Sequence, residues 1–93
     1  MTSPLEYAIW TNQIDAMRLL IDHGANVNKR DRYGGTPLHG AVTNKEAVIL
    51  LINNGADVNA ADNDGWTILK MASWLRLLND DTTQLLKDNG AHM

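Results

Sequence analysis

The chain has 93 residues and a mass of 10.3 kDa, which allows one small domain and argues against a large enzyme with a deep cleft. Its hydrophobic content of 44% and charged content of 20% are typical of a folded globular protein and argue against intrinsic disorder. A net charge of −3 argues against a partner that is a nucleic acid or an anionic membrane, because such binding needs clustered positive charge. The absence of cysteine excludes disulfides, zinc–thiolate sites and thiol nucleophiles.

Neither a secretory signal nor a membrane span is expected. The first ten residues lack a basic segment followed by an apolar run. The longest apolar stretch, from Ala47 to Ile52, has six residues and is too short to cross a bilayer. We therefore expect a cytoplasmic protein, or a nuclear one.

The N-terminal segment carries signals for the start and the end of helices. Ser3 is a helix-capping residue type, and Pro4 stands at the first helical position, where its missing N–H costs nothing. Gly24 stands where a helix is expected to end with a residue in the left-handed conformation. The segment therefore predicts helical structure closed by a glycine.

The middle segment repeats these signals. Thr36 and Pro37 predict the start of a short helix, and a second helix is expected to run to about Ile52, just before Gly55. Residues 58–65 predict an extended arm that ends in a tight turn. In the C-terminal segment, residues 81–87 form the expected second helix.

A shift of 31 positions superimposes residues 16–41 on residues 47–72, and 13 of the 26 aligned positions are identical. Weaker copies stand at the two ends, where residues 4–8 resemble 37–41 and residues 85–91 resemble 50–56. The chain therefore reads as a single domain, 1–93, built of three units at residues 3–35, 36–66 and 67–93. Such a period indicates a stack of repeats.

The middle unit contains Thr36-Pro37-Leu38-His39 and Gly55-Ala56-Asp57-Val58-Asn59-Ala60, followed by Asp62 and Gly65. These motifs resemble the ankyrin repeat. The resemblance covers essentially the whole chain and is strongest in this unit. It implies an all-α repeat solenoid of three helix-turn-helix units with β-hairpin fingers between them and a concave face that binds a partner. It also implies a structural role for His39, whose imidazole would bond to neighbouring groups within the stack.

Two spacings depart from the family pattern. The interval from Thr36 to Gly55 is two residues shorter than that from Ser3 to Gly24, and the loss falls at residues 43–45. The last unit carries two extra residues within 74–79. We expect altered turns between the helices at both places.

The two ends of the stack are expected to differ. Thr82, Thr83 and Lys87 stand where the middle unit has apolar residues, which predicts a polar outer face and a C-terminal cap. No comparable protection is expected at the N-terminal side. Either an exposed first repeat is tolerated, or another surface covers it.

The sequence predicts no metal site, no cofactor and no catalytic group. No histidine pair or histidine–carboxylate cluster has the spacing of metal ligands. The calcium-like segment 62–65 lacks the bidentate glutamate, because Met71 stands at that position. Ser3 and Ser73 have no activating histidine and aspartate partners. We therefore do not expect an enzyme.

Charged residues give the two expected fingers opposite signs. Lys29, Arg30 and Arg32 fall in the first finger, and Asp57, Asp62 and Asp64 fall in the second. One interpretation is simple solvation of two exposed tips, and the other is electrostatic steering of a complementary partner.

The resemblance also implies which residues touch a partner, namely those at the finger tips, before the capping threonine and at the end of the first helix. Four of the five aromatic residues fall at such positions, and only Tyr7 is expected to face the core. Tryptophan and tyrosine are enriched among binding hot spots. The candidate partner-binding residues are Trp10, Arg32, Tyr33, Asp64, Trp66 and Trp74. For Trp10 and Trp74 the alternative is that they pad helix ends against the fingers.

Two functional hypotheses follow. The first is a non-enzymatic adaptor that binds a protein partner through its concave surface, with Arg32 and Asp64 setting the charge register. The second is a structural module that self-associates through the uncapped first repeat and the apolar insertion at residues 74–78.

Overall fold

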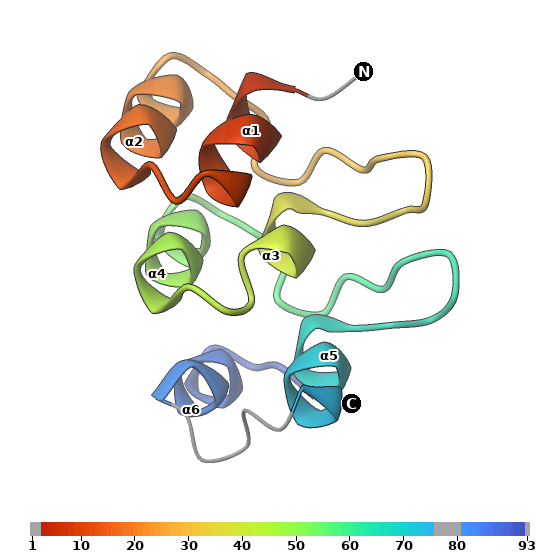
Figure 1. The fold of residues 1–93 in the computed structure, drawn as a ribbon. Coiled ribbons are helices and arrows are strands. Elements are labelled where there is room, and N and C mark those ends of the chain that lie inside the picture. The colour runs from red at the N-terminus through yellow and green to blue at the C-terminus, as the bar shows by residue number, and fades with distance from the viewer. Residues whose placement is uncertain (1–2, 76–80, 93) are drawn as a thin grey trace.

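The computed structural model describes residues 3–75 and 81–92. This part of the chain folds into helices that pair in sequence order and stack one pair below another (Figure 1). The helices are α1 (Pro4–Trp10), α2 (Ile14–Asp22), α3 (Pro37–Gly40), α4 (Lys45–Asn53), α5 (Ile68–Trp74) and α6 (Asp81–Asp88). The predicted all-α repeat architecture is confirmed.

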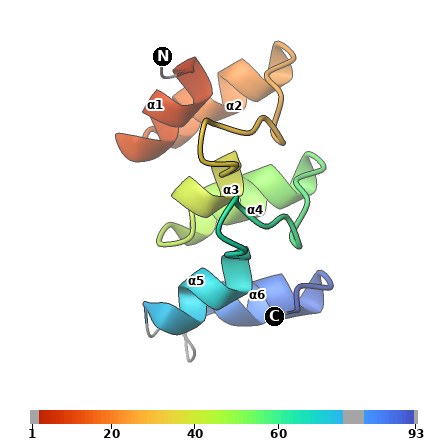
Figure 2. The same cartoon turned by 90° about the vertical axis from the view of Figure 1, so that its right-hand side faces the viewer.

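The stack has two helical layers and a row of projecting loops. Helices α1, α3 and α5 form the inner layer beside the loops, and α2, α4 and α6 form the outer layer (Figure 1). Turning the molecule by 90° shows the three helical pairs, which we call tiers, separated along the stack (Figure 2). The first tier is α1 and α2, the second is α3 and α4, and the third is α5 and α6. We call residues 26–36 the first finger and residues 57–67 the second finger.

The fingers are turns rather than paired strands. In the first finger Asp31 donates its backbone N–H to the carbonyl of Gly35 at 2.9 Å, and in the second Asp62 donates to Trp66 at 3.0 Å. Across residues 3–75 and 81–92 the only β-pairing is an isolated antiparallel bridge between Ala61 and Thr67. The expected β-hairpins are therefore reduced to this bridge in the described chain.

Side-chain caps begin α1, α4 and α5. The Ser3 hydroxyl accepts a hydrogen bond from the N–H of Glu6 at 3.2 Å, and Thr67 accepts from Lys70 at 3.2 Å. The glycines that follow the second helix of each pair have φ angles between 92° and 95°, as predicted for left-handed helix ends. These glycines are Gly24, Gly55 and Gly90.

One core runs through the stack between the two layers. Its fully buried large side chains come from all three helical pairs and belong to one continuous cluster. They are Met17, Leu38, Val48, Leu51, Ile68 and Leu86. Each helical pair buries its apolar stripe against the next pair, which is why no single pair has a complete core of its own.

An asparagine in each finger ties consecutive tiers together. Asn28 donates its side-chain amide to the carbonyl of Gly55 at 3.0 Å and accepts from the N–H of Asp57 at 2.8 Å. Asn59, which is 31 positions later, makes the same two bonds to Gly90 and His92, each at 3.0 Å. The repeated asparagine therefore satisfies backbone groups that follow the helix end of the next tier.

The first altered turn shortens a helix. Helix α3 has four residues, whereas α1 and α5 have seven each. Asn44 then caps α4 through a bond from the N–H of Ala47 at 3.3 Å, and its side-chain amide donates to Asn12 of the preceding turn. The second altered turn, expected within 74–79, lies largely outside the described residues.

The prediction that Tyr7 faces the core is wrong, because its side chain is 62% exposed. Tyr7 corresponds to Gly40 in the 33-residue shift, and a side chain at Gly40 would meet Ile9 and Trp10 of α1. The position therefore faces the preceding tier. Among the described residues no tier precedes α1, so the Tyr7 ring is left in solvent.

The prediction of a polar outer face is wrong for Thr82 and Thr83, which are 3% and 1% exposed. They occupy the places of Ala47 and Val48, both fully buried, and α6 packs against α4 and α5. These two positions therefore face the neighbouring helices rather than the end of the stack. Lys87 is exposed.

Candidate protein-binding surface

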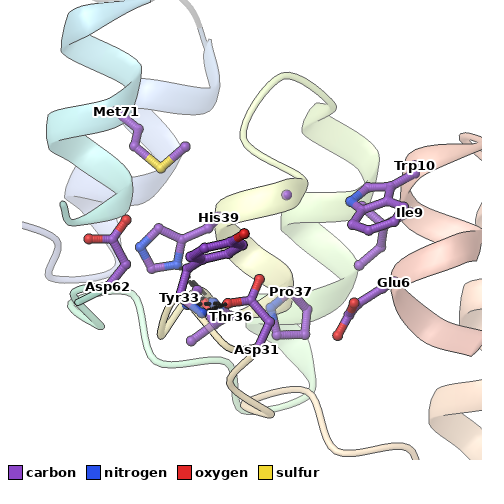
Figure 3. A pocket seen from close by; sticks show the side chains of 12 residues that line it. Glu6, Ile9, Trp10, Asp31, Tyr33, Thr36, Pro37, His39, Asp62 and Met71 are labelled. Carbon is purple, nitrogen blue, oxygen red and sulfur yellow. Dashed lines mark hydrogen bonds between the residues drawn. The ribbon is translucent and has the colours of Figure 1, made fainter. Parts of the chain in front are cut away.

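The inner helices and the two fingers enclose a shallow hollow of about 250 Å³, which we call the first hollow. Its walls come from α1, the first finger, α3 and the start of the third tier. Glu6 and Trp10 lie at one end, and Asp62 and Met71 lie at the other (Figure 3). The hollow therefore crosses from the first tier to the third.

His39 lies buried in the floor of this hollow and joins two tiers. Its Nδ1 accepts a hydrogen bond from the backbone N–H of Thr36 at 3.0 Å. Because Nδ1 is an acceptor, the ring proton is on Nε2, which donates to the carbonyl of Trp66 at 2.7 Å. The structural role predicted for His39 is confirmed.

Trp10 lies against Gly40 of α3, at the end of the first hollow that α1 forms. A Cβ at Gly40 would stand 3.4 Å from its indole Nε1, so the glycine leaves room for the ring. The Trp10 side chain is nevertheless 61% exposed. It therefore packs against the helix below and also presents apolar surface to solvent.

The tip of the first finger carries Tyr33, which is 67% exposed. The guanidinium of Arg32 lies 5.8 Å from the centroid of this ring. The tip is also fixed to the second finger, because Asn63 donates its N–H to the carbonyl of Tyr33 at 2.8 Å. The Tyr33 ring is therefore held at the rim of the first hollow.

A second hollow of about 430 Å³ lies between the second finger and α5. Trp66 and Trp74 form two of its walls, with ring centroids 6.3 Å apart and planes at 87°. Trp66 is half-buried, and Trp74 is 71% exposed. The two hollows adjoin, because Asp62 and Met71 line both.

Each finger contains an aspartate that holds the turn. Asp31 Oδ1 accepts from the N–H groups of Tyr33 and Gly35 at 2.8 and 3.0 Å. Asp62 Oδ1 accepts from Asp64 and Trp66, each at 2.9 Å. In the calcium-like segment 62–65, the Asp62 carboxylate thus binds neighbouring backbone N–H groups. The described residues contain no group of three or more candidate metal ligands.

Arg30 also has a structural use. Its guanidinium donates to the carbonyls of Gly34 at 2.9 Å and Ala61 at 2.7 Å, which links the two fingers. Lys29 and Arg32 of the first finger and Asp64 of the second are exposed. Arg30 and Asp57 are exposed as well, so Asp62 is the one half-buried member of these six finger charges.

The structure places all six sequence-predicted residues along this surface. Trp10 and Tyr33 line the first hollow, while Asp64, Trp66 and Trp74 line the second. Arg32 joins Trp10 and Tyr33 around a further hollow beside the first finger. The aromatic residues therefore form two groups, one in each half of the surface.

Sequence reasoning missed Met71 and Lys70. Met71 lines both hollows, and the ammonium of Lys70 lies 5.1 Å from the centroid of the Trp66 ring. A usable signal was the alignment of Met71 with Gly40, a position that faces the preceding tier. For Lys70 the signal was its place four residues after Trp66, across the cap of α5.

A comparison with protein-family models matches residues 5–93 to ankyrin repeats in three copies. This chain belongs to the ankyrin repeat family. Ankyrin repeats are generally protein–protein interaction modules and are typically non-enzymatic. In the described chain, no helix has the length and apolar character needed to cross a membrane.

Several proteins contain segments similar to this ankyrin chain. An ankyrin repeat protein of vaccinia virus, OPG189, is 41% identical over 47 residues, which is 50% of this chain and 8% of the relative. The Caenorhabditis elegans ankyrin repeat and LEM domain-containing protein 1 homolog is 56% identical over 34 residues, or 37% of this chain and 5% of the relative. The apicidin F cluster transcription factor apf2 of Gibberella fujikuroi is 44% identical over 45 residues, or 48% and 12%. The matched segments thus cover between 5% and 12% of these relatives.

Proposed function

We propose that this chain is a non-enzymatic adaptor that binds a protein partner through the concave surface formed by the fingers and inner helices. Trp10, Tyr33, Trp66 and Trp74 are the proposed contact residues, and Arg32 and Asp64 set the charge register. The proposal includes a cytoplasmic or nuclear location, no nucleic-acid or membrane partner, and a single domain with repeats at 3–35, 36–66 and 67–93.

The observation that carries the proposal is the exposure of large aromatic side chains beside the two adjoining hollows. Trp10, Tyr33 and Trp74 are between 61% and 71% exposed. Aromatic rings of this size contribute large buried areas in protein cores and interfaces. The backbone positions of these three residues are held by helices and by a hydrogen-bonded finger tip. Contact with a partner would therefore cost little backbone entropy at these positions.

Affinity capture from a native lysate tests the proposal. Wild-type protein is compared with Trp66→Ala and Tyr33→Ala, and Leu19→Ala serves as a matched control because Leu19 is 60% exposed on the outer helix α2. We expect the two concave-surface variants to lose a captured protein that Leu19→Ala retains. If all variants retain the captured protein equally, the proposed binding surface is wrong.

Once the partner is identified, the affinity of the Trp66→Ala variant sharpens the test. A hot spot at Trp66 predicts a loss of at least about 2 kcal/mol of binding free energy. A loss below about 0.5 kcal/mol would remove Trp66 from the contact set. Far-ultraviolet circular dichroism checks that the variant remains helical.

Self-association is the second candidate, favoured by the apolar end of the first tier. Tyr7 and Leu19 are 62% and 60% exposed, whereas Leu50, the counterpart of Leu19, is partly buried. Of the insertion at 74–78, the structure describes Trp74 and Leu75, and both are exposed. Sedimentation equilibrium decides the matter, because a strict monomer at high micromolar concentration contradicts self-association. A dimer that Leu19→Glu dissociates supports it.

A further inference from the structure

We propose that the second hollow binds a basic side chain, lysine or arginine, of the protein partner. This inference rests on the proposed function and adds the chemistry that the surface selects. Its occupant is a cation on an aliphatic stem.

Two indole rings line the second hollow. The rings of Trp66 and Trp74 stand 6.3 Å apart at 87°, so their faces point in nearly perpendicular directions. The face of an indole carries negative electrostatic potential and attracts ammonium and guanidinium groups. The ring of Trp74 is 71% exposed and therefore open to a ligand.

Among the described residues, the charged ones that line the second hollow are both acidic, Asp62 and Asp64. Asp62 is anchored by the two backbone N–H groups bound to Oδ1, whereas its Oδ2 accepts no hydrogen bond from the described residues. The carboxylate of Asp64 likewise has no hydrogen bond or ion pair within the described chain. Two carboxylates beside two indole rings favour a cation over a neutral or anionic group.

The molecule contains its own example of this interaction. The ammonium of Lys70 lies 5.1 Å from the centroid of Trp66. Lys70 does not line the second hollow, so its charge stands beside the site rather than within it. An indole at this place therefore already accepts a lysine ammonium.

The remaining walls suit the stem of a basic side chain. Met71 and Leu75 supply apolar surface to the second hollow. Lysine and arginine bury their methylene stems against such surface while the charged end stays near polar groups. A purely apolar side chain would cover the carboxylates without pairing them, which costs desolvation energy.

The test uses three capped amino acids as probes: Nα-acetyl-lysine methylamide, Nα-acetyl-arginine methylamide and the neutral Nα-acetyl-norleucine methylamide, which has the four-carbon side chain of lysine without the terminal amine. Each is titrated into the full chain while the indole N–H signals are followed by NMR and assigned with single Trp→Phe variants. We expect both cationic probes to shift the Trp66 and Trp74 signals and to leave Trp10 unmoved. We expect norleucine to bind at least about threefold more weakly.

Two variants separate charge from apolar contact. Asp64→Asn should weaken the cationic probes by about threefold and leave norleucine unchanged. The matched control is Asp57→Asn, in the same finger but outside the second hollow, and it should change neither. Trp74→Leu should weaken the cations more than norleucine, because it removes the ring and keeps an apolar side chain.

Norleucine binding as tight as lysine binding would overturn the cation preference, and so would the same loss of cation binding in Asp57→Asn and Asp64→Asn. Neither result touches the proposed function, which fails only in the capture experiment with Trp66→Ala and Tyr33→Ala. If all three probes leave the Trp66 and Trp74 signals unmoved up to their solubility limits, the second hollow is not the site and the inference is overturned.

Discussion

The first and second fingers share one framework and carry different surfaces. Asp31 in the first finger and Asp62 in the second each accept hydrogen bonds from two backbone N–H groups. In both fingers a glycine follows three residues later with a φ near +80°. The first finger presents Arg32 and Tyr33 at its tip, whereas the second presents Asp64 at its tip and Trp66 at its base. The same backbone therefore displays cationic and aromatic groups in one tier and acidic and aromatic groups in the next.

The two fingers also differ in what lies against them. A Cβ at Gly34 would stand 2.8 Å from the backbone nitrogen of Asn63, whereas nothing lies within 4 Å of a Cβ at Gly65. The first finger is thus packed against the second, and no described residue packs in the same way beyond the second. Turn geometry and finger packing are therefore separable properties, and substitutions in the two fingers should affect them differently.

The largest effect is expected at Gly34. Gly34→Ala combines left-handed strain with a clash against Asn63 and should reduce the free energy of unfolding by about 3 kcal/mol. Gly65→Ala meets only the strain and should cost about 1 kcal/mol. Urea denaturation of both variants measures the difference, and equal losses would contradict the packing argument.

The next effect is expected at His39. His39→Ala leaves the buried N–H of Thr36 and the partly buried carbonyl of Trp66 without their partner and should cost about 2 kcal/mol. The matched control is Lys70→Ala, at the equivalent and exposed position of α5, which should change stability by less than about 0.5 kcal/mol. Urea denaturation again provides the measurement. If both variants lose the same stability, His39 does not link the tiers.

Smaller and equal effects are expected at the two finger aspartates. Asp31→Ala and Asp62→Ala each remove an acceptor of two backbone N–H groups and should cost about 1 kcal/mol. The Asp→Asn variants keep an oxygen in place and should stay within about 0.5 kcal/mol of wild type. Thermal and urea unfolding check the four variants. An Asn variant as unstable as its Ala counterpart would show that charge, rather than turn geometry, is needed.

The smallest effect concerns the charges at the finger tips and needs an identified partner. If the fingers steer a complementary partner, Arg32→Glu and Asp64→Lys should each slow association by about threefold at low salt, and the difference should vanish at high salt. Lys87→Glu, on the outer helix α6, is the control. Stopped-flow rates equal to wild type in both finger variants would favour simple solvation of the tips.

Much of the fold could be predicted because it depends on local chemistry repeated at a fixed interval. The 31-residue shift located the tiers, and Gly24, Gly55 and Gly90 marked the helix ends that the structure confirms. The spacing of Thr36 and Gly55 also indicated an altered turn, which the structure realises as the short helix α3. These signals need only a few neighbouring residues.

The exposure of individual residues was harder to predict because it depends on the adjoining tier. Tyr7 was expected in the core and is exposed, whereas Thr82 and Thr83 were expected on an outer face and are buried. Residue type alone could not decide these cases. Each position faces the preceding or following helices, so burial depends on whether a tier is present there.

The candidate surface divides in the same way. The sequence indicated the positions of Trp10, Tyr33, Trp66 and Trp74, but the adjoining hollows and the perpendicular indole pair emerge only when α5 packs below the second finger. Arg30 and Asp62 had been grouped with the surface charges, and both prove to hold the fingers in place. Hydrogen bonds across 31 residues cannot be inferred from charge counts.

The sequence by itself determined the repeat, the helix limits marked by capping residues, and the family to which the chain belongs. These features follow from short-range preferences that each tier satisfies separately. Only the tertiary structure decided which faces are covered and which carboxylates have no partner among the described residues. It also decided where two tryptophans meet. The reason is that burial and pairing belong to the contacts between tiers, and the stack creates those contacts.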